Sequence, residues 1–147
     1  MIKLVNNRKR IVFPILLCLL LSVCSTADTK PDLETEGIAL YESEQYEEAI
    51  SVLKQVLTNE PNNAAIHHVL AKSYGRRAEQ INWFSAISYA SKTREHLEIA
   101  VKIEPENVQY LDDMRDFYAK APQFLGGDPK KAKAIDKRIN ELLKIRN

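Results

Sequence analysis

The chain has 147 residues, of which 45% are hydrophobic and 28% charged, with 4 Gly and 2 Cys. This length allows one domain of ordinary size, and the composition is that of a globular protein, which excludes wholesale disorder and collagen-like structure. The 21 Lys and Arg exceed the 20 Asp and Glu by one, so the net charge gives no reason to expect a nucleic-acid partner. The charges are unevenly placed, because four bases lie in the first ten residues and no acid precedes Asp28.

Residues 1–27 have the pattern of an export signal. A basic stretch precedes an apolar run at residues 11–23, which is too short for a bilayer span of about 20 residues. Small residues at Ser25 and Ala27 favour ordinary cleavage, which would leave Asp28 as the first mature residue. Alternatively, residues 21–24 resemble the lipobox of bacterial lipoproteins, with Cys24 as the lipidated residue and a membrane tether, although Val23 departs from that pattern. Both cysteines lie at or before these sites, so the mature domain has no disulfide.

Residues 32–147 are predicted to form an all-α domain. Apolar residues recur three and four positions apart, as in the series from Ala49 to Leu57, and no strand-like alternation is present. Two similar stop-and-start signals, at residues 61–63 and 105–107, end one helix and cap the next. The segments between these signals can be laid on each other as a repeat.

Residues 37–63, GIALYESEQYEEAISVLKQVLTNEPNN, resemble one tetratricopeptide (TPR) repeat. Gly37 and Ala49 are small where two helices cross, and Pro61 closes the unit. The segments YGRRAEQINWFSAISYASKTREHLEIAVKIEPEN and FYAKAPQFLGGDPKKA are similar to a bacterial group of exported TPR proteins. The resemblance implies a short right-handed solenoid of about three helical hairpins, without a settled activity.

The second unit, residues 64–107, is 44 residues long against the usual 34, which predicts an elongated hairpin. Its tip carries Trp83 and Phe84. Packing of these rings against the neighbouring hairpin is the first expectation, and a protruding apolar contact for a partner or a membrane is the second. In the third unit, Gly126 and Gly127 are expected to form a structural turn and Asp128 to cap the last helix.

Catalytic and metal-binding patterns are sparse in this sequence. The three histidines lack the spacing of a metal site, and no nucleophile elbow or nucleotide-binding loop is present. The chain is therefore not expected to be an enzyme, to bind a metal or to carry a cofactor.

The first helix of each hairpin lines the concave surface of a TPR protein, which makes that surface the candidate binding site. The spacing by four predicts a stripe of His68, Lys72 and Arg76 beside a second stripe of Asp112 and Asp116. One interpretation is that Lys72 and Arg76 form ion pairs with Asp112 or Asp116 between hairpins. The other is a charged groove that binds an extended peptide. The set of Lys, Asn and Arg by which some relatives hold a C-terminal carboxylate is absent.

These patterns predict a non-catalytic protein-interaction module of the bacterial cell envelope, periplasmic or lipidated at Cys24, which can also form a homo-oligomer. The alternative is a small-ligand-binding accessory lipoprotein associated with transport. That function would require an enclosed apolar pocket near Tyr41, Tyr74 and Tyr110.

Overall fold

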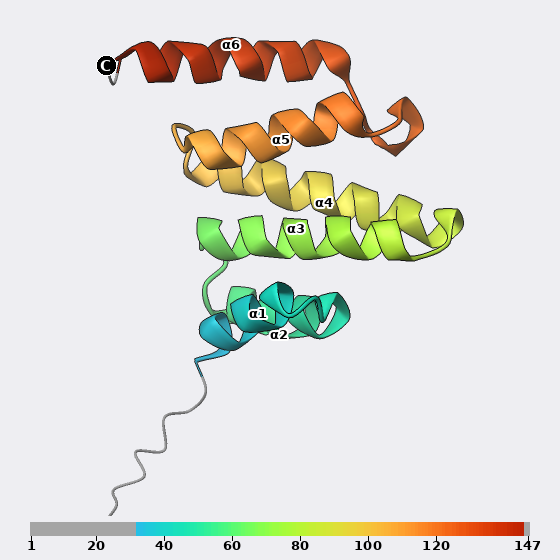
Figure 1. Cartoon of the computed structure of the whole chain (residues 1–147). Coiled ribbons are helices and arrows are strands. Elements are labelled where there is room, and N and C mark those ends of the chain that lie inside the picture. The colour runs from blue at the N-terminus through green and yellow to red at the C-terminus, as the bar shows by residue number, and fades with distance from the viewer. Residues whose placement is uncertain (1–31, 146–147) are drawn as a thin grey trace, which may run out of the picture.

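The computed structural model of this protein describes residues 32–145, so the expected leader and Cys24 lie outside the described residues. The described part is all-α and forms three consecutive helical hairpins that stack in chain order (Figure 1). The helices are α1 (Leu33–Glu42), α2 (Tyr46–Asn59), α3 (Ala64–Gln80), α4 (Trp83–Ile103), α5 (Val108–Lys120) and α6 (Pro129–Ile145), with a short 3-10 turn η1 (Gln123–Leu125). This architecture confirms the predicted helical solenoid. No described helix is both long and apolar enough to span a bilayer.

Short polar side chains begin α3, α5 and α6, where the sequence predicts helix caps. Asn63 Oδ1 accepts a hydrogen bond from the Ile66 amide at 3.1 Å, and Asn107 Oδ1 accepts one from the Gln109 amide at 3.1 Å. Asp128 does the same for α6, accepting from the Lys130 amide at 2.9 Å. Each cap satisfies an amide that has no partner inside its helix, which sets the helix boundary locally.

The two helices of the first hairpin cross at Gly37, as expected. A Cβ atom at this position would lie 2.6 Å from Leu53 Cδ2, so α1 can approach α2 this closely only without a side chain. Ala49 and Leu53 are fully buried beneath this crossing. The small residue of one helix therefore accommodates the large residue of the other.

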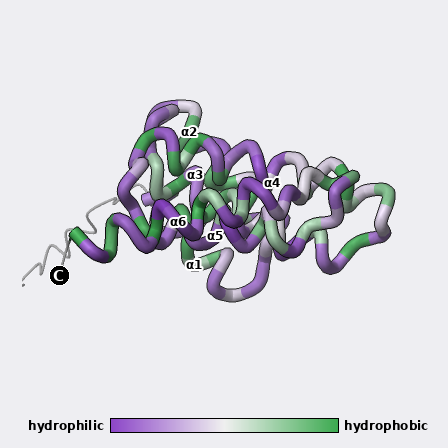
Figure 2. Tube along the Cα trace, turned by 90° about the horizontal axis from the view of Figure 1, so that it is seen from above, coloured by the Kyte–Doolittle hydropathy of each residue, from purple (hydrophilic) through white to green (hydrophobic). Residues whose placement is uncertain are grey.

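The hydrophobic core extends through the whole stack. One cluster joins α1, α2 and α3 around Leu53, Ile66 and Leu70. A second joins α5 and α6 around Leu111 and Ile135, and Ala100 of α4 packs with Tyr110 of α5 between them. Hydrophobic and hydrophilic residues are interspersed along the helices (Figure 2), and the hydrophobic ones pack together in these clusters.

The second hairpin is longer than the first, as predicted. α3 has 17 residues and α4 has 21, against 10 in α1 and 14 in α2. Each helix therefore exceeds its counterpart by about 10 Å at 1.5 Å per residue. The end of this hairpin reaches beyond α1 and α2 (Figure 1).

Candidate functional site: a groove between the second and third hairpins

A groove of about 410 Å³ separates α3 from α5, with α4 beneath it. Its walls and floor are mostly small or apolar, and its charged groups come from α3 and α5. The lining residues are Ala71, Lys72, Gly75, Ala78, Glu79, Ala90, Thr93, Leu97, Asp113, Asp116, Phe117, Lys120, Ala121, Pro122 and Leu125.

Small residues on α3 give the groove its width. Ala71, Gly75 and Ala78 are four and three positions apart and thus lie on one face of the helix. The position of a Cβ atom at Gly75 is 3.6 Å from the Thr93 methyl group of α4, an ordinary contact. Because these side chains are short, α3 leaves space beside α5 that longer side chains would fill. This spacing was present in the sequence but was not recognised there as a signal for the groove.

The turn between α5 and α6 closes one end of the groove. Leu125 and Pro122 of this turn line the groove. Two backbone hydrogen bonds hold the turn in place. The Gly127 amide donates to the Pro122 carbonyl at 3.1 Å, and the Asp128 amide donates to the Tyr118 carbonyl at 2.9 Å. Gly126 has φ of +100°, a left-handed conformation that favours glycine. The two glycines thus serve a structural turn, as expected.

A buried histidine connects α3 to α5 beside the groove. The Nε2–H of His68 donates to Oδ2 of Asp113 at 2.5 Å, and the His68 ring packs on Tyr110 with centroids 4.5 Å apart. This hydrogen bond is the main reason why the pKa of Asp113 lies below its ordinary value, with burial opposing it. His68 is only 4% exposed, so this member of the predicted binding stripe holds hairpins together and is not available to a partner.

The predicted ion pairs between Lys72 or Arg76 and Asp112 or Asp116 do not form; this interpretation was wrong. Arg115 pairs with Asp112 one turn away and with Asp116 at 3.0 Å, and Lys120 also pairs with Asp116. Asp112 has Arg115 three positions away, and Asp116 has Arg115 next to it and Lys120 four positions away, so cations of α5 itself engage both carboxylates.

On α3, the two predicted basic residues have separate surroundings. Lys72 Nζ lies 4.9 Å from the centroid of the Tyr41 ring, and Arg76 pairs with Glu79 at 3.2 Å. Of the five predicted binding residues, Lys72 and Asp116 line the groove, whereas His68, Arg76 and Asp112 do not. The structure therefore brings two of the five residues together in the groove between α3 and α5.

The other two histidines, buried His67 and half-buried His96, form a pair away from the groove. The Nε2–H of His67 donates to the Pro61 carbonyl at 2.9 Å, and its Nδ1 lies 2.8 Å from Nδ1 of His96. Since a carbonyl can only accept, neutral His67 carries its proton on Nε2 and accepts at Nδ1 from the Nδ1–H of His96. Burial, aided by the neighbouring His67, lowers the pKa of His96 to about 4. His96 therefore stays neutral at neutral pH.

The aromatic residues at the tip of the second hairpin are exposed. Trp83 is 61% and Phe84 70% exposed, so they do not pack against the neighbouring hairpin as first expected. Of the three tyrosines proposed for a solute pocket, Tyr41 is half-buried and the other two are buried. Tyr74 and Tyr110 are buried and pack on His96 and His68, respectively. They therefore belong to the core and do not line the groove.

Among residues 32–145, no group of three His, Cys, Asp or Glu side chains is arranged to hold a metal ion.

The comparison with known families identifies the class of repeat. Residues 37–77 match the family model of the TPR repeat, a segment that runs from α1 through α2 and most of α3. A search of curated proteins found no match. TPR repeats generally mediate protein–protein interaction, for which their stacked hairpins provide an extended surface.

Proposed function

We propose that this chain is a non-catalytic protein-interaction module of the bacterial cell envelope, which binds an extended segment of a partner protein in the groove between α3 and α5. The groove supports the proposal because it combines an apolar floor with charged groups within a helical solenoid that contains a TPR repeat. An apolar floor can bury partner side chains, and charged groups at its edge can select their orientation.

The groove favours a partner segment with an apolar side chain flanked by acidic groups. Ala71, Ala90 and Leu97 offer apolar contacts, and Lys72 and Lys120 contribute cations from opposite sides. The carboxylates of Asp113 and Asp116 are already engaged by His68 and by Arg115 and Lys120. Of the charges in the groove, Lys72 has no salt bridge, so it is the cation most available to a carboxylate of the partner.

Charge reversal in the groove tests this function. The double variant Lys72→Glu/Lys120→Glu is expected to lose the partner that cross-links to the wild-type protein in an envelope preparation. A matched control, Lys133→Glu/Lys137→Glu, makes the same charge change at exposed positions on α6 and is expected to retain it. Equal recovery of the partner by both variants, with both proteins folded, would exclude the groove as the binding site.

The proposed location depends on the leader and has its own test. Mass spectrometry of the protein purified from envelope fractions is expected to find Asp28 as the N-terminal residue after ordinary cleavage. A lipid-modified Cys24 at the N-terminus would instead establish a tethered form, and an intact Met1 would exclude export by this leader.

A further inference from the structure

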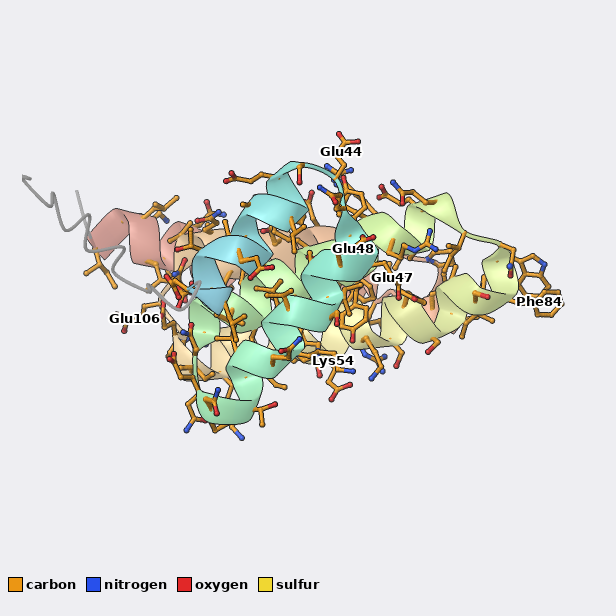
Figure 3. All side chains as sticks on the ribbon, turned by 90° about the horizontal axis from the view of Figure 1, so that it is seen from below. Glu44, Glu47, Glu48, Lys54, Phe84 and Glu106 are labelled. Carbon is orange, nitrogen blue, oxygen red and sulfur yellow. The ribbon has the colours of Figure 1, made fainter. Side chains whose placement is uncertain are left out.

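The tip of the second hairpin presents two aromatic rings to solvent. Trp83 and Phe84 begin α4 after the Asn82 cap, and their ring centroids are 3.8 Å apart. Ile87, one turn further along α4, is 39% exposed. Figure 3 shows Phe84 at the far end of the hairpin, away from the other helices. The rings thus form a small apolar surface that no described element covers.

This tip carries no charge. Residues 80–91 contain no Asp, Glu, Lys or Arg, although such residues make up 28% of the chain. The exposed polar side chains near the rings are Gln80, Asn82, Ser85 and Ser88, all of which are uncharged. Transferring amides and hydroxyls out of water costs far less than transferring ions. The tip can therefore leave water without burying a charged group.

Basic residues flank the uncharged tip on both helices. Arg76 and Arg77 precede it on α3, and Lys92 follows it on α4, against one acid, Glu79. Lys92 lies nine residues after Trp83, or about 13 Å along the helix. Arg77 is paired with Glu47 of α2 at 2.9 Å and Arg76 with Glu79 at 3.2 Å, and Lys92 Nζ lies 5.9 Å from the centroid of the Tyr74 ring without a salt bridge to any described residue. Arg76 and Lys92 are both exposed residues, so their long side chains can reach a surface that the tip contacts. The apolar rings lie at the tip and the cations lie further back along the helices. In a bilayer surface the acyl chains and the phosphates follow in the same order, from the interior outward.

The exposed area is too small for a stable protein dimer through the tips. Aromatic side chains bury 150–250 Å² each, so the two rings expose on the order of 300 Å². A stable protein interface needs about 800 Å² on each partner. A bilayer surface has no such requirement, because lipids rearrange around an inserted side chain, and Trp is enriched at that depth.

We propose that the tip of the α3–α4 hairpin inserts into the headgroup region of an anionic lipid bilayer. Trp83, Phe84 and Ile87 enter the boundary of the acyl chains, and Arg76 and Lys92 face the lipid phosphates. The contact is peripheral, in keeping with the absence of a spanning helix among the described residues. It extends the proposed function without depending on the groove, which lies along α3 and α5 behind the tip.

The chain contains one tryptophan, so its fluorescence reports on the tip directly. The protein starting at Asp28, which contains every described residue, is titrated with vesicles of phosphatidylglycerol and phosphatidylethanolamine. Trp83 emission is expected to shift to shorter wavelength and to be quenched by brominated acyl chains. Phosphatidylcholine vesicles or high salt are expected to weaken the partition, because the cations then lose their attraction to lipid phosphates.

Variants at matched exposed positions distinguish insertion of the tip from nonspecific hydrophobic adsorption to the vesicles. Phe84→Ser keeps the reporter and is expected to weaken the partition about fivefold or more. Ile145→Ser removes another exposed apolar side chain, 82% exposed, at the opposite end of the molecule, and is expected to leave the partition within about twofold. Lys72→Glu/Lys120→Glu, which tests the groove, is not expected to prevent the emission shift.

Two results would overturn this proposal. One is unchanged Trp83 emission with anionic vesicles. The other is an emission shift that needs an envelope protein fraction and does not occur with protein-free vesicles, which would assign the tip to a protein partner. Either result leaves the test of the groove unaffected, because partner cross-linking is measured separately.

Discussion

Gly127 lies where the turn before α6 passes against the end of α5. A Cβ atom built on Gly127 would lie 1.7 Å from the Ala121 carbonyl oxygen, a backbone atom that cannot rotate away. Gly75 is different, because a Cβ atom there would meet only the Thr93 side chain at 3.6 Å. Replacement by Ala is therefore expected to have different effects on the free energy of unfolding at Gly127 and at Gly75.

Gly127→Ala is expected to lower the free energy of unfolding by about 2 kcal/mol or more, because the turn must move to admit the methyl group. Gly75→Ala is the control and is expected to be neutral or to raise that free energy by up to about 1 kcal/mol, since Ala favours a helix over Gly. Urea unfolding followed by circular dichroism measures both. A Gly127→Ala protein as stable as the wild type would contradict the described turn.

At His96, the lowered pKa makes folding stability depend on pH. In the unfolded chain His96 has an ordinary His pKa of about 6.5, whereas in the folded chain its pKa is about 4. As the pH falls, the unfolded chain therefore binds a proton at a higher pH than the folded chain does. Stability is therefore expected to fall as the pH drops from about 6.5 to about 4. The loss is on the order of 1–2 kcal/mol after allowance for solvent screening of this half-buried ring.

Urea unfolding at several pH values measures this dependence. His96→Gln is expected to flatten the curve between pH 6.5 and 4, because Gln does not titrate. Asp113 has a lowered pKa, and its contribution is lost only at more acidic pH, so it does not obscure this range. A wild-type curve that is flat across this range would contradict the lowered pKa of His96 in the folded protein.

At the scale of elements, the third hairpin is held to the second by packing and by the His68–Asp113 hydrogen bond. Replacing Asp113 leaves a buried imidazole without its charged partner. Asp113→Asn is expected to cost about 1–3 kcal/mol in the free energy of unfolding. Asp112→Asn, the neighbouring control, loses only an exposed pair with Arg115 and is expected to change it by about 0.5 kcal/mol or less. If urea unfolding shows that both variants lower the free energy of unfolding equally, the hydrogen bond from His68 to Asp113 does not stabilise the contact between the hairpins.

The starts of α3, α5 and α6 could be predicted because each depends on nearby residues. Asn63, Asn107 and Asp128 accept from amides two or three positions away, so a short stretch of sequence contains the whole interaction. The ion pairs could not be predicted in the same way. Lys72 and Asp116 face one groove but are not paired, because partners on the same helix compete with those across it.

At the scale of the whole molecule, α6 covers the last apolar face of the stack. Ala132 and Ile135 are buried against Leu111 and Tyr118 of α5, and Tyr118 also donates a hydrogen bond to Glu98 of α4. A terminal helix of this kind has an apolar inner face and a polar outer face, as the end of a solenoid requires.

Removal of α6 by a stop after Gly127 is therefore expected to expose Leu111 and Tyr118 and to lower the melting temperature by about 5 °C or more. Thermal unfolding followed by circular dichroism measures this change. Leu143→Ser, at a partly exposed position of the same helix, is the control and is expected to shift the midpoint only slightly. A truncated chain that melts like the full one would show that α6 adds nothing to the core.

The sequence by itself determined the all-α class, the three hairpins, the greater length of the second one and the close crossing at Gly37. These features depend on apolar periodicity, caps and small residues within a few helical turns. Only the tertiary structure decided that His68 is buried against Asp113, that α3 and α5 leave a groove, and that Trp83 and Phe84 are exposed. These outcomes depend on how far each helix extends past its neighbours and on how closely separate hairpins pack. Both quantities are determined by contacts between residues that are far apart in the chain.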